Sequence, residues 1–184
     1  MKTIHLLIVL FALSSVSAAG QKSISAGLGF VGESINAHGI VLEIERDKLY
    51  SEGASLPTRL NLIFQNTEDY FTSSIDIHKG FRRNFSSGFV FEQSVGFGYI
   101  IKSYKEKSYW YRGELGENIP HGNKPVGSVL PSVTIGAGYN FSTDKGGYDY
   151  LWIRPKVYWE LASRTLNTPY FSVQAGFTHT IKTK

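Results

Sequence analysis

Apolar and polar residues alternate along most of the chain, from Ser23 to Ile181. The last segment shows the alternation most clearly, with Phe171 and Phe177 on an apolar face and Ser172 on a face of polar and small residues. A repeat of two residues is typical of a β-strand whose two faces meet different surroundings. The pattern therefore predicts an all-β protein.

The alternation divides the chain into about eight candidate strands. Their alternating positions fall within residues 24–30, 40–45, 59–65, 71–78, 89–101, 129–141, 151–161 and 171–181. Several segments approach the roughly 9 to 11 residues that a tilted strand needs to cross a bilayer, whereas strands of soluble proteins have about five or six. One long connection runs from Ser103 to Gly127. We predict an antiparallel up-and-down transmembrane β-barrel of about eight strands.

The alternation alone does not show which face points into the barrel. A secreted lipocalin-like barrel would surround a ligand with its apolar face, and this is the alternative. Two features of the faces favour a membrane barrel. Small residues recur on the polar face, among them Gly27, Gly96 and Gly136, and leave room for long charged side chains in a narrow lumen. The apolar faces carry almost no charge; Lys79 is the clear exception, near a strand end where its side chain can snorkel.

Aromatic residues gather where the segments end, as in the two interfacial girdles of membrane barrels. Those expected on the outer side are Phe30, Phe71, Tyr99, Tyr104 and Tyr170, and those on the inner side are Phe81, Phe85, Phe89, Phe141 and Tyr148. Two prolines, Pro131 and Pro155, lie within predicted strands, although proline removes a ladder hydrogen bond. We therefore expect a bulge or a hydrogen-bond break near each proline.

The N-terminus has the order of a secretory signal, with Lys2, an apolar run from Ile4 to Leu13, and small residues through Ala19. The apolar run is far shorter than the roughly 20 residues of a membrane-spanning helix. We expect residues 1–20 to be a cleaved signal peptide and residues 21–184 to be one outer-membrane β-barrel domain.

The chain has no cysteine, which excludes disulfides and cysteine-ligated metals. Its formal net charge of +4 is too small to favour nucleic acid as a partner.

The end of the chain has a polar residue, Gln174, then Gly176 two positions later and Phe177 after it. The chain resembles the small eight-stranded outer-membrane β-barrels, a group that includes outer membrane protein X and the barrel domain of outer membrane protein A. These three residues are similar to the assembly signal of such proteins, although His179 and Ile181 stand where the signal has aromatic residues. The resemblance implies a monomer in the outer membrane of a Gram-negative bacterium. Its implied partners are outer-membrane lipid, lipopolysaccharide and the outer-membrane assembly machinery.

The polar faces of the predicted strands bring charged residues into the lumen. These residues are Glu43, Glu45, Arg59, Asp76, His78, Glu92, Arg154, Lys156 and Glu160. Buried charges persist only when they are paired and hydrogen-bonded, so we expect a structural ion-pair network that plugs the lumen. A proton or ion path is the alternative, although so narrow a lumen leaves no continuous column of water. Asp76 and His78 share one face, but no nucleophile stands at a defined spacing, so we expect an interior polar histidine.

A lipid A-modifying enzyme is the alternative function. Barrels of that kind use a His with a Ser and a carboxylate near the outer leaflet. His38, Ser34 and Glu33 lie near the predicted outer rim, whereas His179 falls at the periplasmic end of the last strand. Nothing marks these residues beyond ordinary loop composition, so we expect no catalytic residue, no metal and no cofactor.

The long outer connection is the largest surface left for specific contacts. Its candidate contact residues are Lys105, Lys107, Tyr109, Trp110, Tyr111 and Arg112. Tyr, Trp and Arg are typical of contact hot spots, and the cations match the phosphates of lipopolysaccharide, while a merely solvated loop is the alternative. The sequence predicts a structural or surface-interaction outer-membrane barrel with a plugged polar lumen and one long extracellular loop.

Overall fold

The computed structural model describes residues 22–34, 37–105, 110–112, 118–120, 125–141, 149–161 and 169–183. The predicted signal peptide and Tyr148 lie outside these residues. The strands of the described part are β1 (Lys22–Ser34), β2 (Ala37–Ser51), β3 (Ala54–Ser55), β4 (Thr58–Asn66), β5 (Tyr70–Asn84), β6 (Phe89–Tyr104), β7 (Trp110–Arg112), β8 (Asn118–Pro120), β9 (Val126–Asn140), β10 (Tyr150–Tyr158) and β11 (Tyr170–Thr183). This part of the chain has no helix long and apolar enough to cross a membrane.

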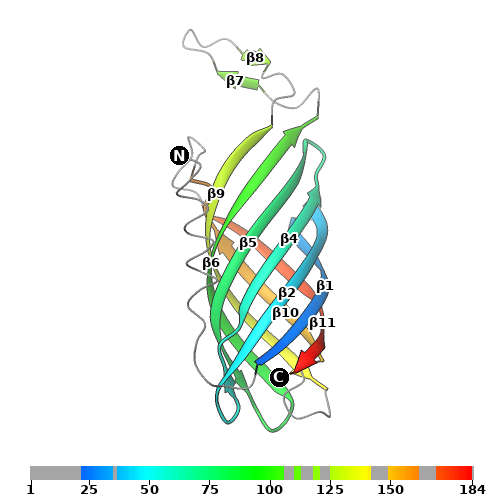
Figure 1. The fold of residues 1–184 in the computed structure, drawn as a ribbon. Helices are drawn as coiled ribbons and strands as arrows, with labels where there is room; N and C mark the ends of the chain where they lie inside the picture. The colour runs from blue at the N-terminus through cyan, green and yellow to red at the C-terminus, as the bar shows by residue number, and fades with distance from the viewer. Residues whose placement is uncertain are drawn as a thin grey trace.

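Eight of the described strands form a closed antiparallel ring in the order β1, β2, β4, β5, β6, β9, β10 and β11 (Figure 1). The ring closes because β1 pairs with β2 on one side and with β11 on the other. The short β3 pairs with both β2 and β5, and β7 and β8 form a separate two-stranded sheet. The prediction of an up-and-down barrel of about eight strands is confirmed.

The two ends of the barrel differ in their connections. The first strand begins and the last strand ends at one end of the barrel, and the connection that carries β7 and β8 lies at the opposite end (Figure 1). Outer-membrane barrels have short periplasmic turns and longer extracellular loops. The end with β7 and β8 is therefore the outer end, and the end with the termini of the barrel is the periplasmic end.

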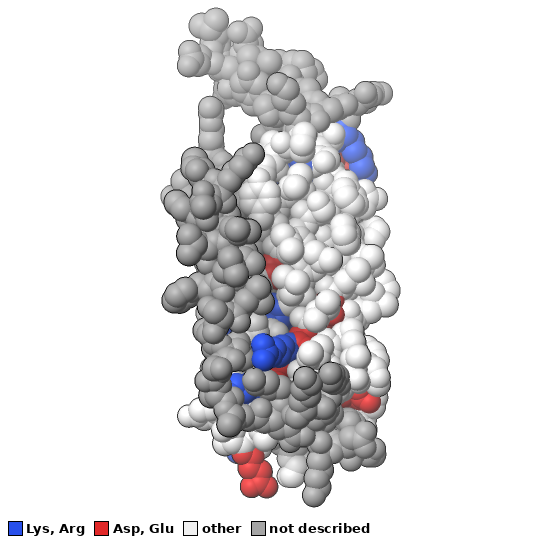
Figure 2. All heavy atoms as spheres, in the orientation of Figure 1, with Lys and Arg blue, Asp and Glu red and all other residues white. Residues whose placement is uncertain are grey.

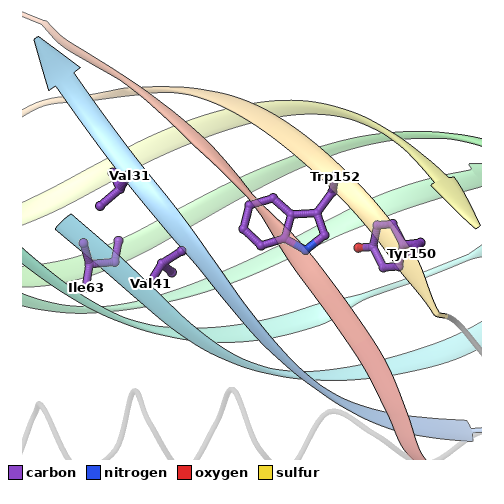
Figure 3. Close-up of a cluster of buried hydrophobic side chains, with 5 residues drawn as sticks. All are labelled: Val31, Val41, Ile63, Tyr150 and Trp152. Atoms are coloured by element: carbon purple, nitrogen blue, oxygen red, sulfur yellow. The ribbon is translucent and has the colours of Figure 1, made fainter. Parts of the chain in front are cut away.

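Burial alternates along the strands in the direction expected for a membrane barrel. The inward residues are mainly polar or charged and are buried, whereas the outward residues are large, apolar and exposed; Val95 is 66% exposed and Ile135 is 56% exposed. A lipocalin-like barrel would bury the opposite face. The structure therefore overturns the alternative of a soluble barrel around an apolar cavity. A small apolar cluster does lie inside the barrel, formed by Val31, Val41, Ile63, Tyr150 and Trp152 (Figure 3).

Only Pro155 of the two prolines lies at a break in the ladder between β9 and β10. Pro155 pairs with Val173 of β11 without irregularity, but the β9–β10 ladder skips Arg154 and Pro155 and resumes in the same register. The break expected at Pro155 is confirmed. Pro131 pairs regularly with Phe97 of β6, so no bulge lies there; its carbonyl accepts a hydrogen bond from Trp159, just beyond the end of β10.

Candidate functional site

The nine charged or titratable residues predicted to face the lumen all point into the barrel, and each is buried. For eight of them burial follows from strand alternation, because each lies between two outward residues of its own strand, whereas Glu160 lies two residues beyond the end of β10. The structure divides them into a cluster near the periplasmic end, a group halfway along the lumen, and one pair near the outer end.

Arg82 lies at the centre of the periplasmic cluster. It is fully buried, and its Nη1 donates to Glu45 Oε1 at 2.6 Å and to Asp47 Oδ2 at 2.9 Å. Its Nη2 donates to Glu92 Oε2 at 2.8 Å and to the Tyr150 hydroxyl at 2.5 Å. One guanidinium from β5 therefore joins β2, β6 and β10 across the lumen.

Glu92 receives all three arginines of this cluster. Arg59 Nη2 donates to its Oε1 at 2.9 Å, Arg82 binds its Oε2, and Arg154 Nε donates to its Oε1. Arg154 also donates through Nη1 to Glu43 Oε2 at 2.5 Å, and its guanidinium lies 3.8 Å from the Trp152 ring centroid. Because these groups are all buried, each charge is stabilised only by its partners.

The middle group is built around Asp76. Lys156 Nζ donates to Asp76 Oδ2 at 2.5 Å, and Asn61 Nδ2 donates to Asp76 Oδ1 at 2.8 Å. His78 Nε2 lies 3.4 Å from Asp76 Oδ1, while its Nδ1 lies 3.4 Å from the Ser94 hydroxyl. Ser94 could thus stand as a nucleophile beside a His and an Asp. All three side chains are buried inside the lumen, however, so this arrangement is a closed hydrogen-bond network.

Glycines on neighbouring strands make room for these side chains. A Cβ at Gly96 would lie 2.4 Å from His78 Cε1, and a Cβ at Gly136 would lie 2.6 Å from Glu92 Cγ. Both separations are far below van der Waals contact. The small residues on the polar face therefore leave space for the charged side chains, as the sequence pattern indicates.

The pair near the outer end consists of Glu160 and Lys102, whose Nζ lies 2.5 Å from Glu160 Oε1. Lys102 Nζ also lies 5.2 Å from the ring centroids of both Tyr70 and Tyr170, a cation–π arrangement. Beside it, the Tyr158 hydroxyl donates to Glu33 Oε1. Charged and aromatic side chains therefore occupy this end of the lumen.

Two of the candidate catalytic residues at the outer rim, Glu33 and His38, are not brought together, and the side chain of Ser34 lies outside the described part of the structure. Glu33 turns inward to Tyr158, whereas His38 is exposed on the outward face of β2. The two side chains therefore lie on opposite faces of the barrel wall. His179 lies at the periplasmic end, where its Nδ1 is 2.8 Å from Asp149 Oδ1. The described residues also contain no group of three or more His, Cys, Asp or Glu that could hold a metal ion.

The proposed loop contacts fall only partly within the described chain. Lys105 is exposed just after β6, and its Nζ donates to the Thr67 carbonyl at 2.5 Å. The backbone of residues 110–112, which are Trp110, Tyr111 and Arg112, forms β7. Lys107 and Tyr109 lie outside the described residues.

Sequence reasoning missed Arg82 and Asp47, which lie beyond the candidate segments 71–78 and 40–45. Both positions nevertheless continue an alternation already recognised, since Arg82 follows Asp76 and His78 by even steps and Asp47 follows Glu45. Strands β5 and β2 run to Asn84 and Ser51, so the two residues are still on the inward face. Counting even steps beyond the ends of these two segments would have found them.

The comparisons with known proteins bear on the fold. No protein-family model matches the chain, and no curated protein matches it. Among solved structures, Neisserial surface protein A is similar with a TM-score of 0.50 and 10% identity, over 89% of this chain and 97% of that chain. The attachment invasion locus protein Ail of Yersinia pestis, in complex with the heparin analogue sucrose octasulfate, is similar with a TM-score of 0.51 and 10% identity, over 89% and 99%.

Structural similarity at about 10% sequence identity shows the fold, and the exposed apolar side chains indicate what surrounds the barrel. The chain has the fold of the small eight-stranded outer-membrane β-barrels, as its sequence pattern indicates. With large apolar side chains exposed around the wall and charged ones enclosed, it is a transmembrane barrel of the outer membrane.

Proposed function

We propose that this protein is a structural or surface-interaction barrel whose lumen is closed by buried ion pairs and whose outer connection makes the specific contacts. The closed lumen is supported by the contacts of Arg82, which binds Glu45, Glu92 and Tyr150 on three other strands. A side chain bonded across the lumen in this way leaves no open path along the barrel axis at that level.

The dimensions of the barrel support a closed lumen. The interior of an eight-stranded barrel is just wide enough for its side chains to fill. A cavity bordered by Gln65, Gln174 and Lys156 has a volume of about 10 Å³, which is room for about one water molecule. Such a space can hold an ordered water without forming a channel.

Ion conductance tests the closed lumen. Purified protein in a planar lipid bilayer with potassium chloride on both sides is expected to give no stepwise current. The double variant Arg82→Gly/Arg154→Gly, which removes the two guanidinium groups that cross the lumen, is the comparison. Heat-modifiable migration on gels shows whether that variant is still folded. Stepwise conductance by the wild-type barrel would overturn the closed lumen.

The second half of the proposal concerns the connection between β6 and β9. Its cations and aromatic residues are suited to an anionic saccharide, and we propose the phosphate-bearing core of lipopolysaccharide as the ligand. Ail, a barrel of the same fold, carries the heparin analogue sucrose octasulfate in its structure, so a highly charged anion can bind a barrel of this kind.

Two loop variants test this contact. Replacement of residues 106–124 by a short turn is expected to abolish binding to lipopolysaccharide, and Lys105→Gln/Lys107→Gln/Arg112→Gln is expected to weaken it while the loop length stays the same. Binding is measured with intact and with dephosphorylated lipopolysaccharide. Unchanged binding by both variants would contradict the proposal. A changed acylation pattern of extracted lipid A with a His38→Ala variant would favour the enzymatic alternative.

A further inference from the structure

Four basic side chains lie on the outward face of the wall near the periplasmic end of β2 and β5. Arg46 and Lys48 alternate with the inward residues of β2, and Lys79 and Arg83 alternate with those of β5. Lys79 and Arg83 are exposed, and Arg46 and Lys48 are half-buried. These four residues are here called the basic wall patch, and they interrupt a mainly apolar exterior. Figure 2 shows Lys and Arg atoms, with Asp and Glu atoms nearby, in the lower part of the face that it draws.

The basic wall patch differs from the lumen in having no counter-charges. Within the described residues, none of its four members forms an ion pair, whereas each lumen arginine contacts carboxylates. An uncompensated cation facing lipid costs free energy that rises with its depth in the bilayer. An anion from the surroundings would offset that cost.

Three residues of adjacent strands lie in one row across this wall. Arg46 pairs with Thr58 of β4, and Thr58 pairs with Lys79 of β5, all on the outward face. Neighbouring strands are about 4.8 Å apart, so the Cα atoms of Arg46 and Lys79 are about 10 Å apart. Two long basic side chains at that separation can converge on one phosphate, and the Thr58 hydroxyl lies between them as a further donor.

The patch lies at the inner boundary of the apolar band. On β2 the outward residues between the exposed His38 and Arg46 are Ile40, Leu42 and Ile44. Eight residues of a strand tilted by about 40° rise about 20 Å, close to the roughly 25 Å apolar band of such barrels. Beyond the patch, Tyr50 is 71% exposed and Phe85 is 48% exposed, as expected for residues at a membrane interface. The cations are therefore at the level of the phosphates of the periplasmic leaflet.

We propose that Arg46, Thr58 and Lys79 form a binding site for the phosphate of an anionic phospholipid in the periplasmic leaflet, with Lys48 and Arg83 contributing charge from the aqueous side. The outward apolar residues above the row, Ile44, Leu60 and Ile77, lie where the acyl chains of that lipid would pack. The site is at the opposite end of the barrel from the loop proposed to contact lipopolysaccharide, so the two proposals are independent.

Native mass spectrometry of the purified full barrel tests this site. Phosphatidylglycerol and phosphatidylcholine with the same acyl chains are added in equal amounts. The wild-type protein is expected to retain phosphatidylglycerol about tenfold more than phosphatidylcholine, because both lipids carry the phosphate but the choline cation offsets its charge and is repelled by the basic residues. The variant Arg46→Gln/Lys79→Gln is expected to bring the ratio close to one, while Lys79→Arg preserves it.

Asn66→Asp is the matched control for Lys79→Gln. Both substitutions lower the net charge by one unit, but Asn66 is exposed at the outer end of β4, away from the patch. The proposal expects an unchanged lipid ratio with Asn66→Asp and a reduced ratio with Lys79→Gln. An equal reduction in both, or a tenfold preference that persists in Arg46→Gln/Lys79→Gln, would overturn it. Displacement of the lipid by millimolar inorganic phosphate would also overturn it, since it would indicate a site for the free anion.

Discussion

The seam between β5 and β6 and the seam between β9 and β10 are built differently. The β5–β6 ladder runs from the pair Tyr70–Tyr104 to the pair Asn84–Val90 without interruption. The β9–β10 ladder runs in two short pieces with a gap at Pro155. Hydrogen bonds from Trp159 to Pro131 and from Leu161 to Val129 extend it at the outer end.

Strand β10 pairs with β11 along its whole length, and on the interrupted β9 side its side chains add contacts across the lumen. Arg154 binds Glu43 and Glu92, and Lys156 binds Asp76 on the far wall. These residues flank the proline that breaks the ladder. The ion pairs therefore do more than fill space, because they join β10 to other strands beside the seam that the proline interrupts.

Removal of Arg154 should have the largest effect on this arrangement. Arg154→Ala removes the shorter of the two arginine contacts of Glu43, leaving Arg59 at 3.5 Å, and removes one of the three arginines that bind Glu92, so buried carboxylates lose compensation. Loss of one partner from a buried ion pair costs about 3–5 kcal/mol. Urea unfolding of the barrel in lipid vesicles should show a decrease of that size in the free energy of unfolding.

Arg59→Ala distinguishes a general loss of ion pairs from a loss at the β9–β10 seam. Arg59 also binds Glu92, but it belongs to β4, whose pairing with β5 is regular. Both variants should be destabilised, and only Arg154→Ala should speed hydrogen exchange of the amides shared by β9 and β10. Equal exchange in the two variants would contradict the assigned role of Arg154.

A charge introduced from the lipid side of the same seam should have a smaller effect. Val133 is 43% exposed on the outward face of β9 and pairs with Val95 and Val157 of the two adjacent strands. Val133→Arg should cost about 2–4 kcal/mol if this face is lipid-exposed near the bilayer midplane. Tyr139→Arg, closer to the periplasmic end, should cost about 0–1 kcal/mol. Equal unfolding free energies for the two variants would mean that the wall does not face lipid as assigned.

The barrel was predictable from the sequence because strand alternation is local. Each strand carries its own inward and outward residues, so the inward direction of Glu43 or Arg154 follows from its neighbours in the chain. Strand ends were less predictable. Arg82 lies two residues before the end of β5, but beyond residue 78, where the recognised alternation ended.

The pairing inside the lumen could not be predicted in the same way. Arg154 and Glu43 are 111 positions apart in the chain and belong to strands that are not neighbours in the ring. Whether they meet depends on the stagger of all the strands around the barrel, which is set by registers that the hydrophobic pattern leaves open in steps of two. The binding of three arginines to Glu92 is therefore visible only once the strands of the closed barrel are in register.

The smallest predicted effect comes from repair of the ladder itself. The hydrogen bonds at Trp159 and Leu161 show that odd-numbered residues of β10 donate toward β9, so the nitrogen of Pro155 faces Ile135 and offers it no hydrogen. Pro155→Val restores that donor and should raise the free energy of unfolding by about 1 kcal/mol, since a net hydrogen bond is worth about 0.5–1.5 kcal/mol. The new backbone amide at this position should be protected in hydrogen exchange. In the Arg154→Ala variant, the added substitution Pro155→Val should slow hydrogen exchange of the amides shared by β9 and β10. If exchange is not slowed, the missing ladder bond is not the reason that β10 depends on its side chains at this seam.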